Sequence, residues 1–259
     1  MTGPAPLDRS AERHGSSGTG LAGTGPSGTA AGRFWPLPRQ RHWLLLAILL
    51  SAVVVALGVT VKLLPGDTAA ELGIDQNLSQ HHIAVLTAVA MAINLVFGPV
   101  VGLAVVAVIA LVIWLVRGDL VKALAFGLVA CSGWAASEAF KLLIARQRPD
   151  QGLLVDPLSP ETGSNSFPSG HVSFAVALAF ALFFLVRGTR WARPVAVLGA
   201  VVAVIVAWSR LYVGVHYPTD VTASFLAASA AVLVVTGLWN RFGPALAERI
   251  PAALRSPRR

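Results

Sequence analysis

The sequence predicts an all-α protein, a polytopic membrane helix bundle with six transmembrane helices. Its mean hydropathy is +0.70, 55% of its 259 residues are hydrophobic and only 12% are charged. Soluble domains carry about 25% charged residues. The apolar residues occur in runs close to the length of about 20 residues that a bilayer requires. This composition excludes a soluble enzyme and a chain that is disordered throughout.

The composition divides the chain into three segments. Residues 1–40 are rich in Gly, Ser, Thr, Pro and Arg. Such a segment cannot bury enough apolar surface to offset its chain entropy, so we expect a disordered cytoplasmic tail. Residues 41–240 form the expected six-span membrane domain, and residues 241–259 form a basic cytoplasmic C-terminal tail.

Six apolar runs account for the expected spans. Between the first and the second lies the segment 66–97, whose second half, Ile83 to Phe97, is apolar. We interpret that half as an interfacial or re-entrant helix, with an additional span as the alternative. The predicted spans are 43–64, 98–116, 120–144, 171–187, 191–209 and 218–239.

The net charge of +8 does not indicate nucleic-acid binding, because the basic residues lie in loops between apolar runs rather than in one patch. Most Lys and Arg fall in the N-terminal tail and after the second, fourth and sixth runs. By the positive-inside rule, we expect a multi-pass cell-membrane protein with cytoplasmic termini. The extracytoplasmic side then holds Lys62, Lys141, Arg146, Arg148 and Arg210. Clustered polar groups at one face of a hydrophobic chain predict an extracytoplasmic active site.

The segment Pro168-Ser169-Gly170-His171 opens the fourth predicted span. Pro168 and Gly170 interrupt a preceding helix and Ser169 can cap the next one. The backbone N–H groups at this helix start form a candidate anion site, which Gly170 lets an anion approach closely. His171 is a candidate general acid or base. The alternative is a polar helix start that carries a His without a function.

The segment from Ser209 to Asp220 joins the fifth and sixth spans. The planar fork of Arg210 suits phosphate oxygens. Asp220 follows His216 by four residues, so its carboxylate can orient the imidazole and leave the other ring nitrogen as a nucleophile. Pro218 suits the first position of the last helix. The alternative is a His–Asp pair that only caps this helix.

A third segment places Lys141 near the end of the third span and Arg148 just beyond it, and we expect Pro149 to end the helix. Glu138, one turn before Lys141, can pair with it. With Arg210, these cations match a dianionic phosphoryl group, whose transfer depends mainly on positioning and electrostatic stabilisation.

No metal or other cofactor is expected. The acidic residues of the following loop are scattered, and His81-His82 lack the helical spacing of zinc ligands. Cys131 lies in an apolar run and is interpreted as a small buried hydrophobic residue.

The three segments read K-x6-R-P, P-S-G-H and S-R-x5-H-x3-D, and they extend over residues 141–220. This order resembles the signature of the type-2 phosphatidic acid phosphatase superfamily, and the six-span layout is similar over about residues 43–240. The resemblance implies a phosphatidic acid phosphatase type 2/haloperoxidase-like core. It also implies a metal-independent membrane lipid phosphatase.

The resemblance also implies roles for single residues. His216 attacks phosphorus to form a phosphohistidine, Asp220 orients it, and His171 protonates the leaving oxygen and then activates water. Arg146 resembles an extra basic residue often found before the Arg-Pro; we interpret it as a loop charge, with a contact to a second phosphate as the alternative. Tyr212 receives no role, and neither does Tyr217. The residues expected to hold the phosphoryl oxygens are Lys141, Arg148, Ser169, Gly170 and Arg210.

The expected partner is a lipid phosphate in the bilayer: an isoprenoid diphosphate, as in an undecaprenyl-diphosphatase, phosphatidic acid or phosphatidylglycerophosphate. One alternative is a lipid phosphotransferase that uses the same intermediate. A vanadium-dependent haloperoxidase of the same superfamily is disfavoured, because six apolar runs do not suit a soluble enzyme. A non-catalytic transporter or scaffold predicts lost motif residues, and none is lost. The sequence leaves the head group and the oligomeric state open.

Overall fold

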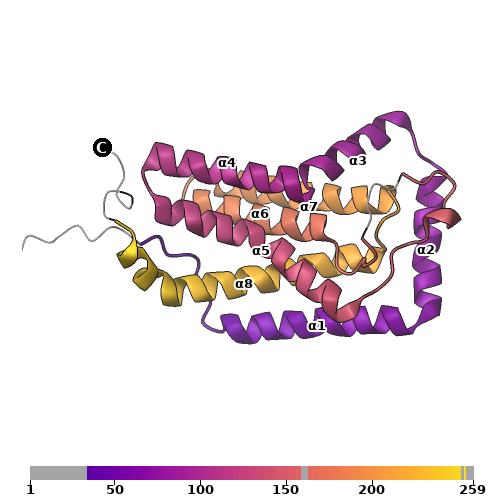
Figure 1. Cartoon of the computed structure of the whole chain (residues 1–259), viewed down its shortest axis with the longest axis horizontal. Helices are drawn as coiled ribbons and strands as arrows, with labels where there is room; N and C mark the ends of the chain where they lie inside the picture. The colour runs from indigo at the N-terminus through magenta and orange to yellow at the C-terminus, as the bar shows by residue number, and fades with distance from the viewer. Residues whose placement is uncertain (1–33, 159–162, 252–253, 255–259) are drawn as a thin grey trace, which may run out of the picture. The chain divides into compact units, whose positions relative to one another are not determined.

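The computed structural model describes residues 34–158, 163–251 and 254, and confirms the all-α fold class. Figure 1 shows most helices running along one direction, with α2 lying across one end. The helices are α1 (Trp43–Leu63), α2 (Pro65–Ser79), α3 (Ala84–Val96), α4 (Pro99–Arg117), α5 (Leu120–Ile144), α6 (Gly170–Val186), α7 (Ala192–Tyr212) and α8 (Pro218–Arg249), with a 3-10 turn at Gln151–Leu153.

Six of these helices correspond to the six expected spans. Within the described residues, α1, α4, α5, α7 and α8 are long and apolar enough to cross a membrane. The sixth, α6, is apolar but has only 17 residues, about 25 Å at 1.5 Å per residue. It packs against α5, α7 and α8, so protein rather than lipid covers its buried first turns.

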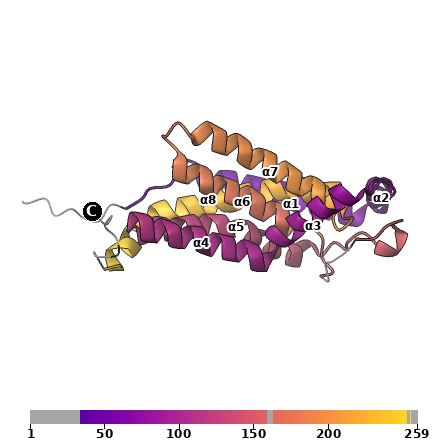
Figure 2. The same cartoon turned by 90° about the horizontal axis from the view of Figure 1, so that it is seen from above.

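The segment between the first two spans forms α2 and α3. Figures 1 and 2 place α2 at the end of the bundle where α1 ends and α8 begins. The 13 residues of α3 extend about 20 Å, less than a bilayer requires. This length fits the interfacial or re-entrant interpretation rather than an additional span. Because α3 packs against α7, it lies beside the segment that carries Arg210.

Two glycines permit close helix contacts. A Cβ at Gly133 of α5 would lie 2.1 Å from the carbonyl oxygen of Ser173 on α6. A Cβ at Gly237 of α8 would lie 2.2 Å from the ring of Trp43 on α1. Small residues at such positions let membrane helices approach closely. The first contact sets the last turns of α5 beside the start of α6, and the second joins the first and last helices.

The segment 34–38, at the end of the predicted N-terminal tail, contacts α8. Leu37 is 2% exposed, and its backbone N–H and carbonyl pair with the side-chain amide of Asn240, both at 3.0 Å. Phe34 stacks on Trp239. Apolar side chains and hydrogen bonds thus hold this segment against α8. The rest of the predicted tail, residues 1–33, lies outside the described residues.

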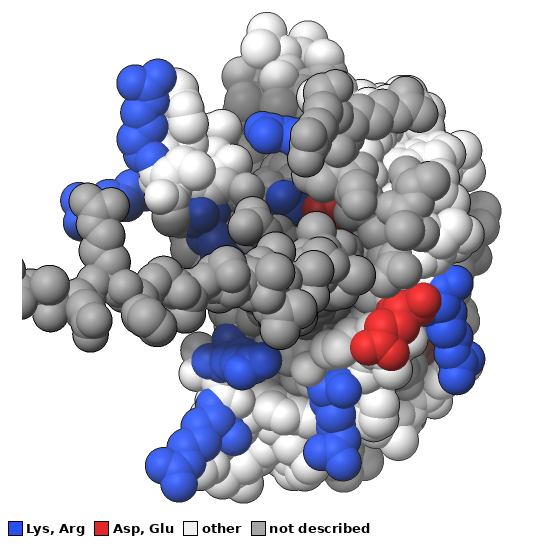
Figure 3. All heavy atoms as spheres, turned by 90° about the vertical axis from the view of Figure 1, so that its left-hand side faces the viewer, with Lys and Arg blue, Asp and Glu red and all other residues white. Residues whose placement is uncertain are grey.

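Exposed Lys and Arg side chains surround the end of the bundle opposite α2. Figure 3 views this end, which contains the α4–α5 and α6–α7 turns and the C-terminal part of α8. Helix α8 continues through Arg249, so the first part of the segment expected as a C-terminal tail is helical. We call this end the basic end. Its exposed arginines, which lie at or near these helix ends, include Arg39, Arg41, Arg117, Arg187, Arg190, Arg193, Arg241 and Arg249.

Candidate active site

The three sequence segments meet at the end of the bundle near α2. Helix α5 ends at Ile144 because Ala145 adopts a left-handed conformation with φ 50°, so the helix stops before Pro149, its expected end. The backbone N–H of Ser169 lies 3.4 Å from the carbonyl oxygen of Asp220. This contact joins the segment that opens α6 to the segment that opens α8, the helix whose first residue is Pro218.

His216 lies between a carboxylate and a guanidinium group. Its Nδ1 is 3.5 Å from Oδ2 of Asp220, and its Nε2 is 3.2 Å from a terminal nitrogen of Arg148. His216 is 1% exposed and Asp220 is fully buried. One ring nitrogen thus faces a carboxylate and the other faces a cation, an arrangement in which an imidazole can act as a nucleophile.

Arg148 and Arg210 are fixed mainly by oxygens. Arg148 donates to the carbonyl groups of Gly163 at 2.6 Å and Val215 at 2.9 Å. Arg210 is fully buried at the end of α7 and donates to the side-chain oxygen of Asn94 and, at 3.3 Å, to a carbonyl group of α3. These bonds hold both guanidinium planes in one orientation.

Asn94 of α3 joins two of the predicted site residues. Its carbonyl oxygen lies 3.1 Å from Nε2 of His171, and its side-chain oxygen accepts from Arg210. Because a carbonyl only accepts hydrogen bonds, this contact places a proton on Nε2 of His171. Sequence reasoning missed Asn94, although an amide side chain within the apolar run from Ile83 to Phe97 was a signal for it.

A cavity of about 690 Å³ opens beside the start of α6. Its lining includes Asn94, Trp134, Lys141, Gly170 and His171, whereas His216, Arg148 and Arg210 are not among its lining residues. Lys141 pairs with Glu138 at 2.8 Å, as predicted. A Cβ at Gly170 would lie 3.7 Å from Nζ of Lys141, so glycine leaves the space between this cation and the helix start open.

Ser169 takes the cap position of α6 without a side-chain capping bond. Its backbone N–H donates to the hydroxyl of Ser224 at 2.9 Å, so this N–H is occupied within the protein. Its own hydroxyl oxygen is buried and has no hydrogen-bond partner within the described residues. Near the helix start, the hydroxyl of Ser169 is therefore better placed than its N–H to contact a bound anion.

Arg146 is not the loop charge that its sequence position suggested. It is 3% exposed. One terminal nitrogen donates to Oδ1 of Asp220 at 2.7 Å and the other to Oε2 of Glu71 at 2.6 Å. The guanidinium stacks 4.0 Å above the ring of Tyr217. Sequence reasoning missed Glu71, because nothing in the local sequence of α2 indicates a partner 75 residues away.

Asp75, one turn after Glu71 on α2, is a second buried acid that sequence reasoning missed. It is fully buried, and neither of its carboxyl oxygens has a hydrogen-bond partner within the described residues. Burial, together with the negative charges of Asp220 and Glu71, raises the pKa of Asp75 to about 8, against the opposing effect of Arg146. The carboxyl group is therefore mainly protonated at neutral pH.

Tyr212, which received no role from its sequence position, fixes the start of α3. Its hydroxyl accepts from the N–H of Ile83 at 2.9 Å, and its carbonyl oxygen lies 2.7 Å from Nε2 of His82. Nδ1 of His82 is 2.9 Å from a carboxyl oxygen of Asp156. This network joins α3 to the end of α7. Within the described residues, no group of three or more His, Cys, Asp or Glu could hold a metal ion.

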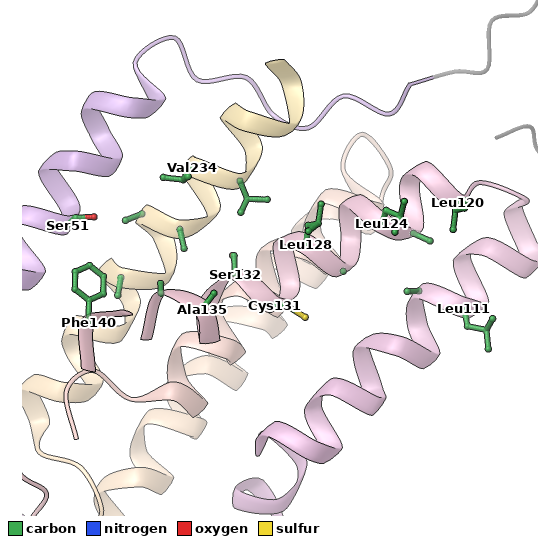
Figure 4. A pocket seen from close by; sticks show the side chains of 18 of the residues that line it. Ser51, Leu111, Leu120, Leu124, Leu128, Cys131, Ser132, Ala135, Phe140 and Val234 are labelled. Carbon is green, nitrogen blue, oxygen red and sulfur yellow. The ribbon is translucent and has the colours of Figure 1, made fainter. Parts of the chain in front are cut away.

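An apolar cavity of about 900 Å³ lies along α5 (Figure 4). Side chains of α1, α4, α5 and α8 line it, among them Leu111, Leu128, Phe140 and Val234. Cys131 of α5 lines both this cavity and the cavity that contains His171. The two spaces are therefore adjacent; one has charged and polar side chains in its lining, and the other is almost entirely apolar.

Fold and site together define a class: a helical multi-pass membrane protein with buried His, Arg and Asp side chains gathered at one end. The sequence profile of the PAP2 superfamily matches residues 122–244, which contain all three signature segments. This match and the similarity to undecaprenyl-diphosphatase BcrC confirm the expected resemblance to the PAP2 superfamily. A solved structure, the transmembrane PAP2-type phosphatidylglycerolphosphate phosphatase of Bacillus subtilis, has a similar fold. It matches with a TM-score of 0.65 and 24% identity, over 75% of this chain and 96% of that one.

Three curated relatives are similar in sequence. Undecaprenyl-diphosphatase BcrC of Bacillus subtilis is 28% identical over 68% of this chain and 84% of its own length. Undecaprenyl-diphosphatase of Sulfolobus acidocaldarius is 37% identical over 36% of this chain and 43% of its own length. Phosphatidylglycerophosphatase B of Bacillus subtilis is 34% identical over 39% of this chain and 50% of its own length. The chain thus spans about half the length or less of the latter two relatives.

Proposed function

We propose that the protein is a metal-independent lipid phosphatase that works through a phosphohistidine at His216. The observation that carries the proposal is the placement of His216 between Asp220, 3.5 Å from Nδ1, and Arg148, 3.2 Å from Nε2. In this arrangement Nε2 is the nitrogen that faces the incoming phosphoryl group. The carboxylate of Asp220 stabilises the charge that develops on the ring.

Two proton transfers complete the reaction. Nε2 of His216 forms the bond to phosphorus while the bond to the leaving oxygen breaks, and His171 gives that oxygen a proton. His171 then takes a proton from water, which attacks phosphorus and releases inorganic phosphate and neutral His216. Fixed cations stabilise the equatorial oxygens in both steps, and Lys141, Arg148 and Arg210 are the candidates.

The substrate we propose is an isoprenyl diphosphate, with phosphatidylglycerophosphate as the second candidate. The two undecaprenyl-diphosphatase relatives support the first and phosphatidylglycerophosphatase B supports the second. The test is phosphate release by the purified protein, in EDTA, from a panel of lipid monophosphates and diphosphates. No release from any lipid would overturn the proposal. A phosphorylated lipid product in place of free phosphate would make the protein a phosphotransferase.

We propose that the apolar cavity along α5 holds the lipid tail, because Cys131 lines both it and the cavity beside His171. Leu128→Trp should fill part of this space. We expect it to raise KM for a long-chain substrate several-fold and to leave KM for a short water-soluble phosphate unchanged. An equal effect on both substrates would contradict this placement of the tail.

We propose that the site faces the extracytoplasmic side and that both termini face the cytoplasm. The basic end and the end near α2, which holds the site, lie at opposite ends of the bundle (Figure 1). The exposed residue Ser164 lies on the site side and the exposed Thr189 lies in the α6–α7 turn. With Cys131 replaced, Ser164→Cys should react with an impermeant thiol reagent in whole cells, and Thr189→Cys should react only after lysis. The reverse pattern would move the site to the cytoplasm.

A further inference from the structure

Arg146 connects α2 to the carboxylate that faces His216. Its two terminal nitrogens point to different acids, one to Asp220 at 2.7 Å and the other to Glu71 at 2.6 Å. Arginine can hold two carboxylates at once because its planar fork carries donors on both terminal nitrogens. Lysine, with a single ammonium group, lacks this geometry.

The other contacts of Glu71 and Asp220 fix the same arrangement. Glu71 accepts hydrogen bonds from the backbone N–H of Thr219 at 2.7 Å and from its hydroxyl at 2.6 Å. Oδ2 of Asp220, the oxygen that faces His216, accepts from the N–H of Tyr217 at 2.9 Å. The two oxygens of Asp220 thus have different neighbours, because Oδ1 contacts Arg146 while Oδ2 faces the imidazole.

The result is a row of four ionisable side chains, the partly buried Glu71 followed by the buried Arg146, Asp220 and His216. In such an environment, the charge at one end of the row affects proton binding at the other end, because little water screens it. Among the described residues, further titratable and charged neighbours include Asp75 of α2, Tyr217 before α8, and Arg148 on the far side of His216. Asp75 is mainly protonated below pH 8 and adds little charge there.

We infer that Arg146 and Glu71 are positioning residues of the reaction: Arg146 holds Asp220 toward His216 and offsets its charge, and Glu71 offsets the charge of Arg146. This inference rests on the proposed function. A buried ion pair often has no role beyond structure, and its net contribution to stability is small. The two roles differ in what they predict for proton binding by His216, which a purely structural pair leaves unchanged.

The two substitutions should shift the pH profile in opposite directions. Arg146→Gln removes the cation, so Asp220 favours the protonated imidazole more strongly. The acid limb of kcat/KM should then move up, by on the order of one pH unit. Glu71→Gln leaves Arg146 uncompensated, so Asp220 favours the protonated imidazole less. The acid limb should then move down by a smaller amount, because Glu71 is more distant.

The experiment uses the full chain in detergent micelles with a water-soluble aryl phosphate. The substrate ionises in the same way with every variant. Differences between the pH profiles of kcat/KM therefore come from groups of the protein. We also expect kcat to fall about 10- to 100-fold in Arg146→Gln, with KM changed less than about threefold. Matched controls are Glu248→Gln and Arg249→Gln at the exposed end of α8, which make the same charge changes and should leave the profile in place.

Arg146→Lys keeps the experiment informative if Arg146→Gln fails to fold. Lysine keeps the cation, so the acid limb should stay while kcat falls. The inference would be overturned if the acid limb stayed in place in both Arg146→Gln and Glu71→Gln, or if it moved in the same direction in both. The proposed function fails separately, when the unsubstituted protein itself releases no phosphate from any lipid in EDTA.

Discussion

The two ends of the bundle use arginine in different ways. At the site end, Arg146 and Arg210 are buried, and each donates to several defined oxygens. At the basic end, Arg190 and Arg193 are exposed, where water and salt screen the charge. The two ends therefore differ in the burial and in the hydrogen-bond partners of their guanidinium groups, as well as in the number of basic residues.

The buried arginines of the site end depend on the geometry of the guanidinium group, whereas the exposed arginines of the basic end contribute only their positive charge. Screened surface charges contribute about 0–1 kcal/mol to an interaction, whereas removing one partner of a buried charge pair costs several times more. Substitutions at the site end should therefore have large effects that depend on the chemical group. Substitutions at the basic end should have small effects on catalysis, whatever the group.

The two histidines should give the largest effects. His216→Ala removes the nucleophile, so no phosphoenzyme should form and activity should fall to background. His171→Ala keeps the nucleophile and loses the proton donor, which costs about 10²–10⁴-fold. That loss should be smaller for an aryl phosphate, whose leaving group departs unprotonated, than for an alkyl lipid phosphate. Asp220→Asn should be intermediate, because the imidazole remains without its supporting charge.

Rapid-quench trapping of acid-labile phosphohistidine, together with turnover of both substrates, measures these differences. A phosphoenzyme that forms in His216→Ala and disappears in His171→Ala would reverse the two roles. An unchanged burst in both variants would refute covalent catalysis by histidine.

Arg210→Lys tests whether the site end needs the guanidinium group itself. The substitution keeps the charge and loses the fork that contacts Asn94 and a carbonyl group of α3. Hydrogen bonds to charged groups contribute about 1.5–3 kcal/mol, so kcat/KM should fall about 10- to 100-fold. The same exchange at the basic end, Arg193→Lys, should change kcat/KM less than about twofold. Similar losses in both variants would remove the distinction between the two ends.

Asp75 predicts a pH-dependent stability. Its pKa is about 8 in the folded protein and 3.8 in the reference state, so between these values the folded state binds one more proton than the unfolded state. Stability should therefore fall as pH rises from about 4 to 8 and then stop changing. Asp75→Asn should remove this component.

The measurement is the midpoint of thermal unfolding in detergent across that pH range. The difference between Asp75→Asn and the unsubstituted protein should grow with pH up to about 8. Asp150→Asn, at an exposed carboxyl group of the same end, should show no such growth. A constant difference for Asp75→Asn at every pH would contradict the buried, protonated state.

The smallest catalytic effect should come from the N-terminal segment, where two deletions differ by five residues. Deleting residues 2–33 should leave activity within a few-fold. Deleting residues 2–38 also removes Leu37, which is buried and bonded to Asn240, and the lost burial costs about 1.5–3 kcal/mol. The midpoint of thermal unfolding should therefore fall only in the longer deletion. Equal midpoints would show that the contact with α8 contributes nothing.

Most of the fold was predictable because an apolar run long enough to cross a bilayer predicts a helix without information from the rest of the chain. The predicted span 120–144 coincides with α5, and α8 begins at Pro218 as predicted. The pair of Glu138 and Lys141 was also predictable, since both partners lie on one helix turn. These features depend on residues close in sequence.

The contacts around the site were less predictable because their partners are distant in sequence. Arg146 lies 74 residues from Asp220 and 75 from Glu71, and Asn94 lies 116 from Arg210. The sequence pattern around Arg146 is that of an ordinary polar loop. Only the tertiary fold brings α2 against the start of α8 and turns this loop charge into a buried one.

The contact between α1 and α8 constrains the order in which the protein assembles. Trp43 of α1 fits against Gly237 of α8, and Leu37 pairs with Asn240. During synthesis α8 emerges roughly ten seconds or more after α1. Until α8 has been synthesised, α1 lacks the helix against which it mainly packs. A nascent chain that stops before Pro218 therefore leaves this surface of α1 uncovered.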